Sequence, residues 1–451
     1  MSSLPDFLAT FTYTSLDKGK RQIRLIRFQE YATVDEDGIR LSLETHDMSE
    51  CPPYFALSYV WGIDAPRHEM VINDGVLLAR NSLWLALSQL KTRQVDLKVK
   101  YFWIDAICIN QDDILERGHQ VNLMGDIYSH ARFVVAWLGS ETDDSHAAIK
   151  AISTYNLTTD KTEKDMLLAE NSSHVVSLLQ RSYFERMWIV QEFILAEEII
   201  MICGSDSFRW DREMSNIVKA MTTKWLDKDE GTGVTVWLAS ERFNRKQTGY
   251  PMELYRLLVY FRSCRCSDLR DRVYALIGLL DPSHSRSWTA DYTISREQLW
   301  CRVINSSLEE SRTMFSYIAL RLWEALELPL EDNSLELFRF VYWVIHFDEL
   351  WNARNQMPDD VKRHHEENLL DQLDANTMYD KILRDFDSFP AIVGDTSWKL
   401  FRENLLKIME WEHQHNSQCI SSSEIVSSAH RTQPTLKKWR EKVNPNSWAL
   451  N

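Results

Sequence analysis

The chain has 451 residues, of which 44% are hydrophobic and 26% charged, the range of ordinary globular proteins. Only 13 residues are glycine and 11 are proline, which excludes collagen-like and low-complexity sequences. The formal net charge of −15 opposes nucleic acid as a partner, because proteins that bind phosphate backbones normally carry a basic surface.

Short apolar runs typical of strands alternate with segments of helical spacing over the first 205 residues. Strands are predicted at 23–28, 55–60, 101–109, 133–139 and 197–203, with a hairpin turn at Asp74-Gly75. Helices are predicted at 82–93, from Asp113 onward with Glu116 completing a capping box, and at 143–155, 165–180 and 184–196. This alternation indicates an α/β fold with a mostly parallel sheet and the hairpin as an antiparallel elaboration.

Beyond residue 205 the pattern is almost wholly helical. Apolar residues recur three and four apart at 252–262, 270–280, 296–308 and 334–347. The sequence therefore predicts two domains, an α/β domain over 1–205 and an α-helical region over 206–451.

The seven cysteines form no C-x-x-C pair, and the N-terminus lacks the basic and apolar regions of a secretory signal. No apolar run approaches the roughly 20 residues that span a bilayer. These features favour a cytoplasmic protein without a membrane span.

Individual residues suggest two types of site, a metal site and a cysteine nucleophile. His413, His415 and Cys419 lie close in sequence, but a structural zinc site needs a fourth ligand, so no metal is predicted. Cys108 follows a predicted strand, and His119 lies on the next helix, which leaves a cysteine nucleophile open beside a buried structural thiol.

Three blocks stand out: FALSYVWG at 55–62, WIDAICINQ with its continuation within 102–139, and RSYFERMWIVQEFILA at 181–196. They resemble the HET domain of fungal heterokaryon-incompatibility proteins. The matching residues are Ala56, Leu57, Ser58, Tyr59, Trp61, Gly62, Trp103, Ile104, Asp105, Ala106, Cys108, Ile109, Asn110, Gln111, Glu116, Arg117, Gln120, Met124, Tyr128, Ala131, Arg186, Trp188, Gln191 and Glu192. Tyr183 departs from the family, which often has Trp there, and we expect this to affect packing more than chemistry. Residues 264–281 also resemble the segment that commonly follows these domains.

The resemblance implies a role in non-self recognition and programmed cell death, with possible self-association through the domain and an incompatibility partner protein. HET domains are also similar to TIR domains, which implies a flavodoxin-like sheet. Trp188 and Glu192 are four residues apart, as in the TIR pattern, and so share one helix face. In TIR enzymes that cleave NAD⁺, the corresponding Glu is catalytic.

The resemblance thus implies Glu192 as a catalytic residue, with NAD⁺ as a substrate and no bound cofactor. One carboxylate beside a ribose stabilises an oxocarbenium-like state. Ser58 and Asp105 at strand ends, Trp61 and Trp188 as stacking walls, and Arg186 opposite phosphate would complete the site. Three further interpretations stay open: Glu192 as a structural carboxylate that caps the helix or pairs with Arg186, although six residues is not an ideal same-face spacing; the tryptophans as core residues; and the domain as a non-catalytic death-signalling module. Catalysis requires Glu192 to open onto a ligand-sized hollow.

Overall fold

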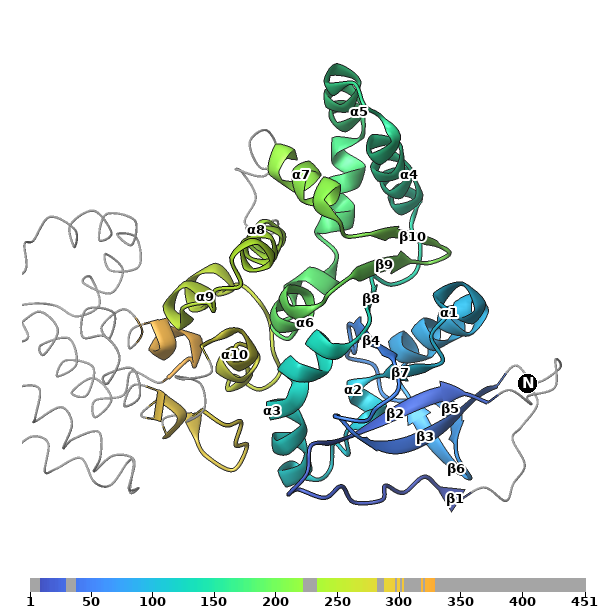
Figure 1. Ribbon diagram of the computed structural model, residues 1–451, viewed down its shortest axis with the longest axis vertical. Helices are drawn as coiled ribbons and strands as arrows, with labels where there is room; N and C mark the ends of the chain where they lie inside the picture. The colour runs from blue at the N-terminus through green and yellow to red at the C-terminus, as the bar shows by residue number, and fades with distance from the viewer. Residues whose placement is uncertain are drawn as a thin grey trace, which may run out of the picture. The chain divides into compact units, whose positions relative to one another are not determined.

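The computed structural model describes residues 9–29, 38–221, 233–281, 288–296, 298–300, 302–303, 318 and 321–328. These residues form a ten-stranded mixed sheet flanked by helices (Figure 1). The strands are β1 (Ala9–Thr10), β2 (Gln22–Phe28), β3 (Ile39–Asp47), β4 (Tyr54–Tyr59), β5 (His68–Ile72), β6 (Gly75–Ala79), β7 (Tyr101–Trp103), β8 (Val134–Trp137), β9 (Ile199–Cys203) and β10 (Asp206–Arg209). The helices are α1 (Asn81–Leu97), α2 (Asp105–Cys108), α3 (Ile114–His130), α4 (Asp143–Leu157), α5 (Lys161–Leu179), η1 (Ser182–Glu185), α6 (Ile189–Leu195), α7 (Arg212–Met221), α8 (Gly233–Thr248), α9 (Leu254–Tyr260), α10 (Asp271–Tyr274) and η4 (Ile277–Leu279).

The strands stand in the order β1-β6-β5-β3-β2-β7-β4-β8-β9-β10. Four neighbours, β7, β4, β8 and β9, run parallel to one another. If these four strands are numbered in chain order, they stand in the sheet as second, first, third and fourth. The predicted α/β class is therefore confirmed, and the sheet is mixed because β2, β6 and β10 each form an antiparallel pair with a neighbour.

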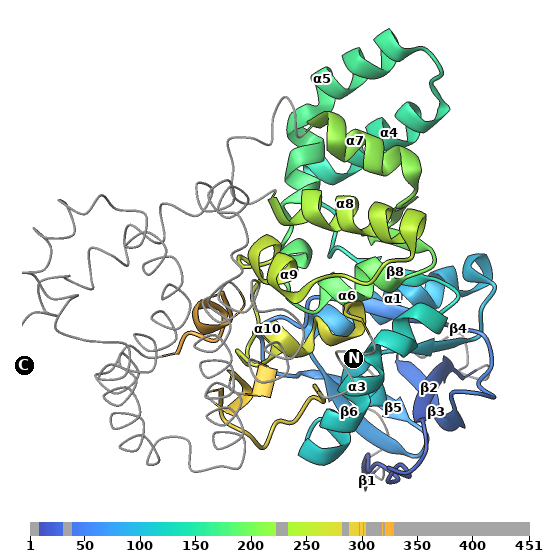
Figure 2. The same cartoon turned by 60° about the vertical axis from the view of Figure 1, so that its left-hand side comes forward.

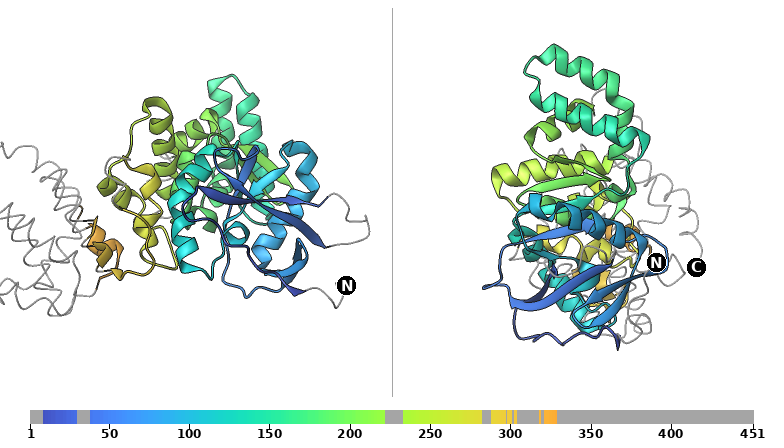
Figure 3. Two further views of the ribbon diagram at one scale, coloured as in Figure 1. Left: turned by 60° about the horizontal axis from the view of Figure 1, so that its bottom comes forward. Right: turned by 90° about the vertical axis from the view of Figure 1, so that its right-hand side faces the viewer.

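Helices cover both faces of the parallel strands. α1 lies on one face, and α3 and α6 pack together on the other (Figure 1). α3 buries apolar residues at helical spacing there: Val121, Met124, Ile127 and Tyr128. α4 and α5 form a helical hairpin beyond the β10 edge, which Figure 2 and both views of Figure 3 show projecting from the sheet.

Elements after residue 205 pack directly on the α/β layers. α8 contacts α6, and η4 contacts both α3 and α6. One compact unit comprises residues 1–299 and 320–328. The domain boundary after residue 205 stays a prediction, and the helix expected at 334–347 lies outside the described residues.

The hairpin forms, but its turn lies one residue earlier than predicted. Ile72 pairs with Gly75, so the loop residues are Asn73 and Asp74, and of these two Asn73 alone has a positive φ, 52°. Gly75 begins β6, where a Cβ would lie 2.6 Å from the Cα of Phe11. The glycine therefore permits close approach of the β1 segment and does not form the turn.

Two other elements differ from the prediction. The strand expected at 101–109 ends at Trp103, because Asp105 starts α2 and accepts the Ala106 N–H at 2.7 Å. The helix expected at 184–196 is divided into η1 and α6 by an extended Arg186. β3 was not predicted, although its sequence IRLSL alternates apolar and polar residues.

Candidate functional site

The three sequence blocks meet at the carboxyl ends of the parallel strands. Ser58 lies near the end of β4, Asp105 follows β7, and Glu192 lies in the first turn of α6. Parallel strands end at the same edge of a sheet, which is where open α/β sheets bind ligands. The structure therefore brings together three residues that are up to 134 positions apart in the chain.

Glu192 is almost completely buried. One carboxylate oxygen, Oε2, accepts a hydrogen bond from the Ser58 hydroxyl, which itself lies 2.9 Å from the hydroxyl oxygen of Tyr183. Oε2 also lies 3.4 Å from Nη1 of Arg186. The other oxygen, Oε1, is buried and has no hydrogen-bond partner among the described residues. Burial of a carboxylate oxygen without a hydrogen-bond donor costs free energy. Such a group in a folded protein therefore requires an explanation.

Arg186 covers the carboxylate. Its side chain is 16% exposed, whereas that of Glu192 is 1% exposed. The two are six positions apart and still pair, because Arg186 lies in the extended segment before α6 and not on the helix. Burial lowers the pKa of Arg186, but the nearby charges of Glu192 and Asp105 raise it by more, so the guanidinium is firmly cationic.

Asp105 is half-buried beside this pair. Burial raises its pKa to about 6; the positive charge of Arg186 opposes this rise and the negative charge of Glu192 adds to it. Its Oδ2 accepts the indole N–H of Trp61 at 2.9 Å, which fixes that half-buried ring at the end of β4. Trp61 thus contacts Asp105, and its role as an aromatic wall stays a prediction.

Trp188 is directed to different partners. Its indole N–H donates to Oδ2 of Asp271 at 3.1 Å, and the other oxygen of Asp271 accepts the Tyr292 hydroxyl at 2.7 Å. Burial raises the pKa of Asp271 to about 6. The side chains of Trp188 and Glu192 therefore have different hydrogen-bond partners, although they are four residues apart.

Two residues escaped the sequence reasoning. Tyr183 was expected to matter for packing, yet its hydroxyl hydrogen-bonds Ser58 beside Glu192. Asp271 lies in the segment at 264–281 that resembles the sequence following HET domains. For Tyr183 the only available signal was its position inside the third block.

The expectation that Glu192 opens onto a ligand-sized hollow is wrong for this conformation. A cavity of about 320 Å³ lies elsewhere, between the start of β9, the end of β10 and α8, and Trp210, Arg212 and Phe243 are among its lining residues. The residues gathered around Glu192 form a closed polar cluster, which we call the Glu192 cluster: Ser58, Asp105, Tyr183, Arg186 and Glu192.

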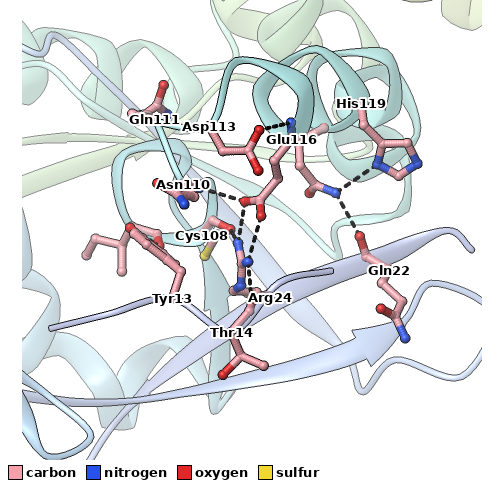
Figure 4. A network of polar contacts seen from close by, with 12 residues as sticks. Tyr13, Thr14, Gln22, Arg24, Cys108, Asn110, Gln111, Asp113, Glu116 and His119 are labelled. Atoms are coloured by element: carbon pink, nitrogen blue, oxygen red, sulfur yellow. Dashed lines mark hydrogen bonds and ion pairs between the residues drawn. The ribbon is translucent and has the colours of Figure 1, made fainter. Parts of the chain in front are cut away.

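The segment after Asp105 builds a second, structural network (Figure 4). Arg24 from β2 forms two hydrogen bonds with Glu116, at 2.6 and 2.9 Å, and also donates to the carbonyl oxygen of Cys108. Asn110 N–H donates to Glu116 Oε1 at 2.7 Å. Asp113 caps α3 as predicted, but Glu116 does not complete the capping box because its carboxylate binds Arg24 instead.

The cysteine nucleophile is not supported by these contacts. Cys108 is completely buried, and burial raises its pKa to about 12, so the thiolate is absent at neutral pH. Its sulfur accepts the Ile104 N–H, as a structural thiol does. Among the described residues no group of three or more His, Cys, Asp or Glu is placed to hold a metal, and His413, His415 and Cys419 lie outside them.

In the described part of the chain, no helix combines the length and apolar character needed to cross a bilayer. Residues 54–192 match the family model described as "Heterokaryon incompatibility protein (HET)". A relative from Neurospora crassa, "Heterokaryon incompatibility protein 6, OR allele", is 30% identical over 351 residues, which cover 63% of this chain and 51% of the relative. The chain thus spans about half the length of that relative. No solved structure matches the chain. The family match includes every residue of the Glu192 cluster, so the chain carries a HET domain at residues 54–192.

Proposed function

We propose that this protein acts in heterokaryon incompatibility, the non-self recognition that ends in programmed cell death, and that its HET domain acts by cleaving NAD⁺. The name of the 30% identical relative supports the first part. Self-association of residues 1–205 and a partner protein sensed by residues 206–451 belong to the same proposal.

One observation carries the enzymatic part: Ser58, Asp105, Arg186 and Glu192 converge at the carboxyl ends of the parallel strands. The strand order second-first-third-fourth is that of the first four strands in a flavodoxin-like sheet, whose ligands bind at this edge. This order supports the TIR-like interpretation of the domain.

The chemistry that these residues supply is cleavage of a glycosidic bond. The bond between C1′ of the ribose and the nicotinamide nitrogen breaks, and its electron pair stays on nicotinamide. Water then bonds to C1′ and releases a proton, which yields ADP-ribose. The carboxylate of Glu192 stabilises the positive charge that develops on the ribose, while Asp105 orients its hydroxyls.

Substrate binding requires Arg186 to leave Glu192, because the carboxylate is otherwise covered. The released guanidinium is then available to pair with the diphosphate of NAD⁺, for which its fork of donors is suited. The same movement exposes Oε1 of Glu192, the oxygen that lacks a donor.

A second function, a non-catalytic signalling module, is favoured by a specific observation. Glu192 is almost completely buried and pairs with Arg186, as a structural carboxylate does. In that case the cluster holds α6 against β4, and binding of partner proteins carries the signal.

Incubation of the full chain with NAD⁺, with nicotinamide release followed by chromatography, separates the two functions. We expect turnover by the wild type, a loss of at least about 100-fold in Glu192→Gln, and no change in Glu198→Gln, an exposed carboxylate paired with Arg209. Absence of turnover at high protein concentration, together with cell killing retained by Glu192→Gln, would establish the signalling module instead.

A further inference from the structure

The segment that carries Arg186 lies alongside residues from beyond the family match. The N–H of Met187 donates to the carbonyl oxygen of Arg265 at 2.8 Å, and the N–H of Arg265 donates to that of Glu185 at 2.5 Å. Arg186 and Arg265 thereby form a parallel bridge. The backbone on both sides of Arg186 is fixed by one residue that lies 79 positions later.

A side-chain contact fixes the next residues. Trp188 donates its indole N–H to Asp271, a carboxylate that is only 8% exposed. Tyr292 occupies the second oxygen of Asp271, so both oxygens of this buried group are satisfied by neutral donors. Release of either donor leaves a buried carboxylate oxygen unpaired, which resists the movement of Trp188.

A third contact reaches the turn of α6 that carries Glu192. The Cα of Gly278 lies close to Gly125 in α3, and a Cβ on Gly278 would lie 2.6 Å from Oε1 of Gln191. Gln191 is completely buried and immediately precedes Glu192. One continuous stretch of chain, residues 264–278, therefore holds the start of α6 by hydrogen bonds at Met187 and Trp188 and packs closely on Gln191 through Gly278.

We propose that residues 264–278 act as a latch, which holds Arg186 over Glu192 and keeps the HET-domain site closed until the latch is displaced. The closed state leaves Oε1 of Glu192 buried without a donor. A group in such an unfavourable environment persists only where the surrounding contacts over-determine it, and the three latch contacts do so. Displacement of the latch frees Arg186 to rotate, and it lets water or a ligand donor reach Oε1.

The latch assigns a regulatory function to a segment that lies beyond the family match, which ends at residue 192. A partner that competes for residues 264–278 opens the site without contacting it, because the contacts that fix Arg186 are main-chain bonds to Arg265. The role of the latch in catalysis rests on the proposed NAD⁺ cleavage. Its geometry is testable without any substrate.

The test measures access to Glu192 in the full chain, by carbodiimide labelling of carboxylates with peptide mass spectrometry. Asp271→Leu and Trp188→Phe each remove the Trp188–Asp271 hydrogen bond, and Arg209→Gln, which breaks an exposed ion pair, is the matched control. We expect both latch variants to raise the labelling rate of Glu192 about tenfold, and the control to leave it unchanged. Hydrogen exchange of residues 185–192 should accelerate in parallel.

Glu116 provides the internal reference, because it is also a buried carboxylate paired with an arginine but lies in the Arg24 network. Labelling that rises at Glu192 and not at Glu116 supports the latch. Labelling that rises at both, or at neither, overturns it, the first because the whole domain has opened and the second because Arg186 stays closed without the latch. NAD⁺ turnover is assayed separately: an accessible Glu192 without turnover refutes NAD⁺ cleavage and leaves the latch standing.

Discussion

The Arg24–Glu116 pair gives the most sharply defined prediction, since both side chains are almost fully buried, at 1% and 5% exposure. In the variant Glu116→Gln the shape of the side chain is kept and its charge is removed. The amide NH₂ then faces a donor, either a guanidinium N–H of Arg24 or the Asn110 N–H. The guanidinium is left buried without its counter-charge.

The magnitude follows from these contacts. Glu116 accepts three hydrogen bonds, two of them from a charged donor, and bonds to charged groups contribute about 1.5–3 kcal/mol each. Such values are not additive, and breaking one partner of a buried ion pair costs about 3–5 kcal/mol. We therefore expect Glu116→Gln to lower the free energy of unfolding by about 3 kcal/mol.

The assay is urea denaturation followed by tryptophan fluorescence, with hydrogen exchange at the Asn110 amide as a local readout. The matched control is Arg27→Gln, which breaks the half-exposed Arg27–Glu44 pair and should cost at most about 1 kcal/mol. The double variant Arg24→Met with Glu116→Leu should recover part of the loss, because it removes both buried charges together. Equal costs for Glu116→Gln and Arg27→Gln would refute the argument that burial makes this pair important.

Three further outcomes are expected. Because burial raises the pKa of Asp105 from 3.8 to about 6, the folded state holds this proton more tightly, so stability should fall as pH rises from 4 to 6; Asp105→Asn should remove about 2 kcal/mol of that fall in thermal melts. Gly75→Ala places a Cβ 2.6 Å from the backbone of Phe11 and should cost about 1–3 kcal/mol, whereas Gly38→Ala, with open space around it, should leave the melting temperature nearly unchanged. Cys108 should resist iodoacetamide in the native protein and react only after denaturation, and rapid native alkylation would contradict its burial.

Much of the α/β architecture was available from local patterns. The strands β2, β4, β8 and β9 and the helices α3, α4 and α5 fall where periodicity places them, because each buries one face or lies wholly in the core. Local patterns failed where a long-range contact interrupts an element. Arg186 breaks the predicted helix because its neighbours bond to Arg265, a residue that no local pattern connects with it.

The candidate site, too, could be predicted from the sequence only in part. The blocks predicted that Ser58, Asp105, Arg186 and Glu192 gather, and they do so because parallel strands end at one edge of the sheet. A pairing of Arg186 with Glu192 was open from the sequence, but six residues is a poor spacing along one helix; the pair forms because Arg186 lies in the extended segment before α6. The sequence did not show that Trp188 would bond to Asp271, which lies outside the matched domain.

By itself the amino-acid sequence determined most of the succession of strands and helices and the presence of a HET domain, since both are written in residue order and local periodicity. Only the tertiary structure decided which polar groups are buried, which charges pair and which carboxylate is covered. The physical reason is that burial and pairing depend on what the rest of the chain places opposite a side chain. For Glu192 that includes a hydroxyl from β4 and an arginine fixed by the backbone of Arg265.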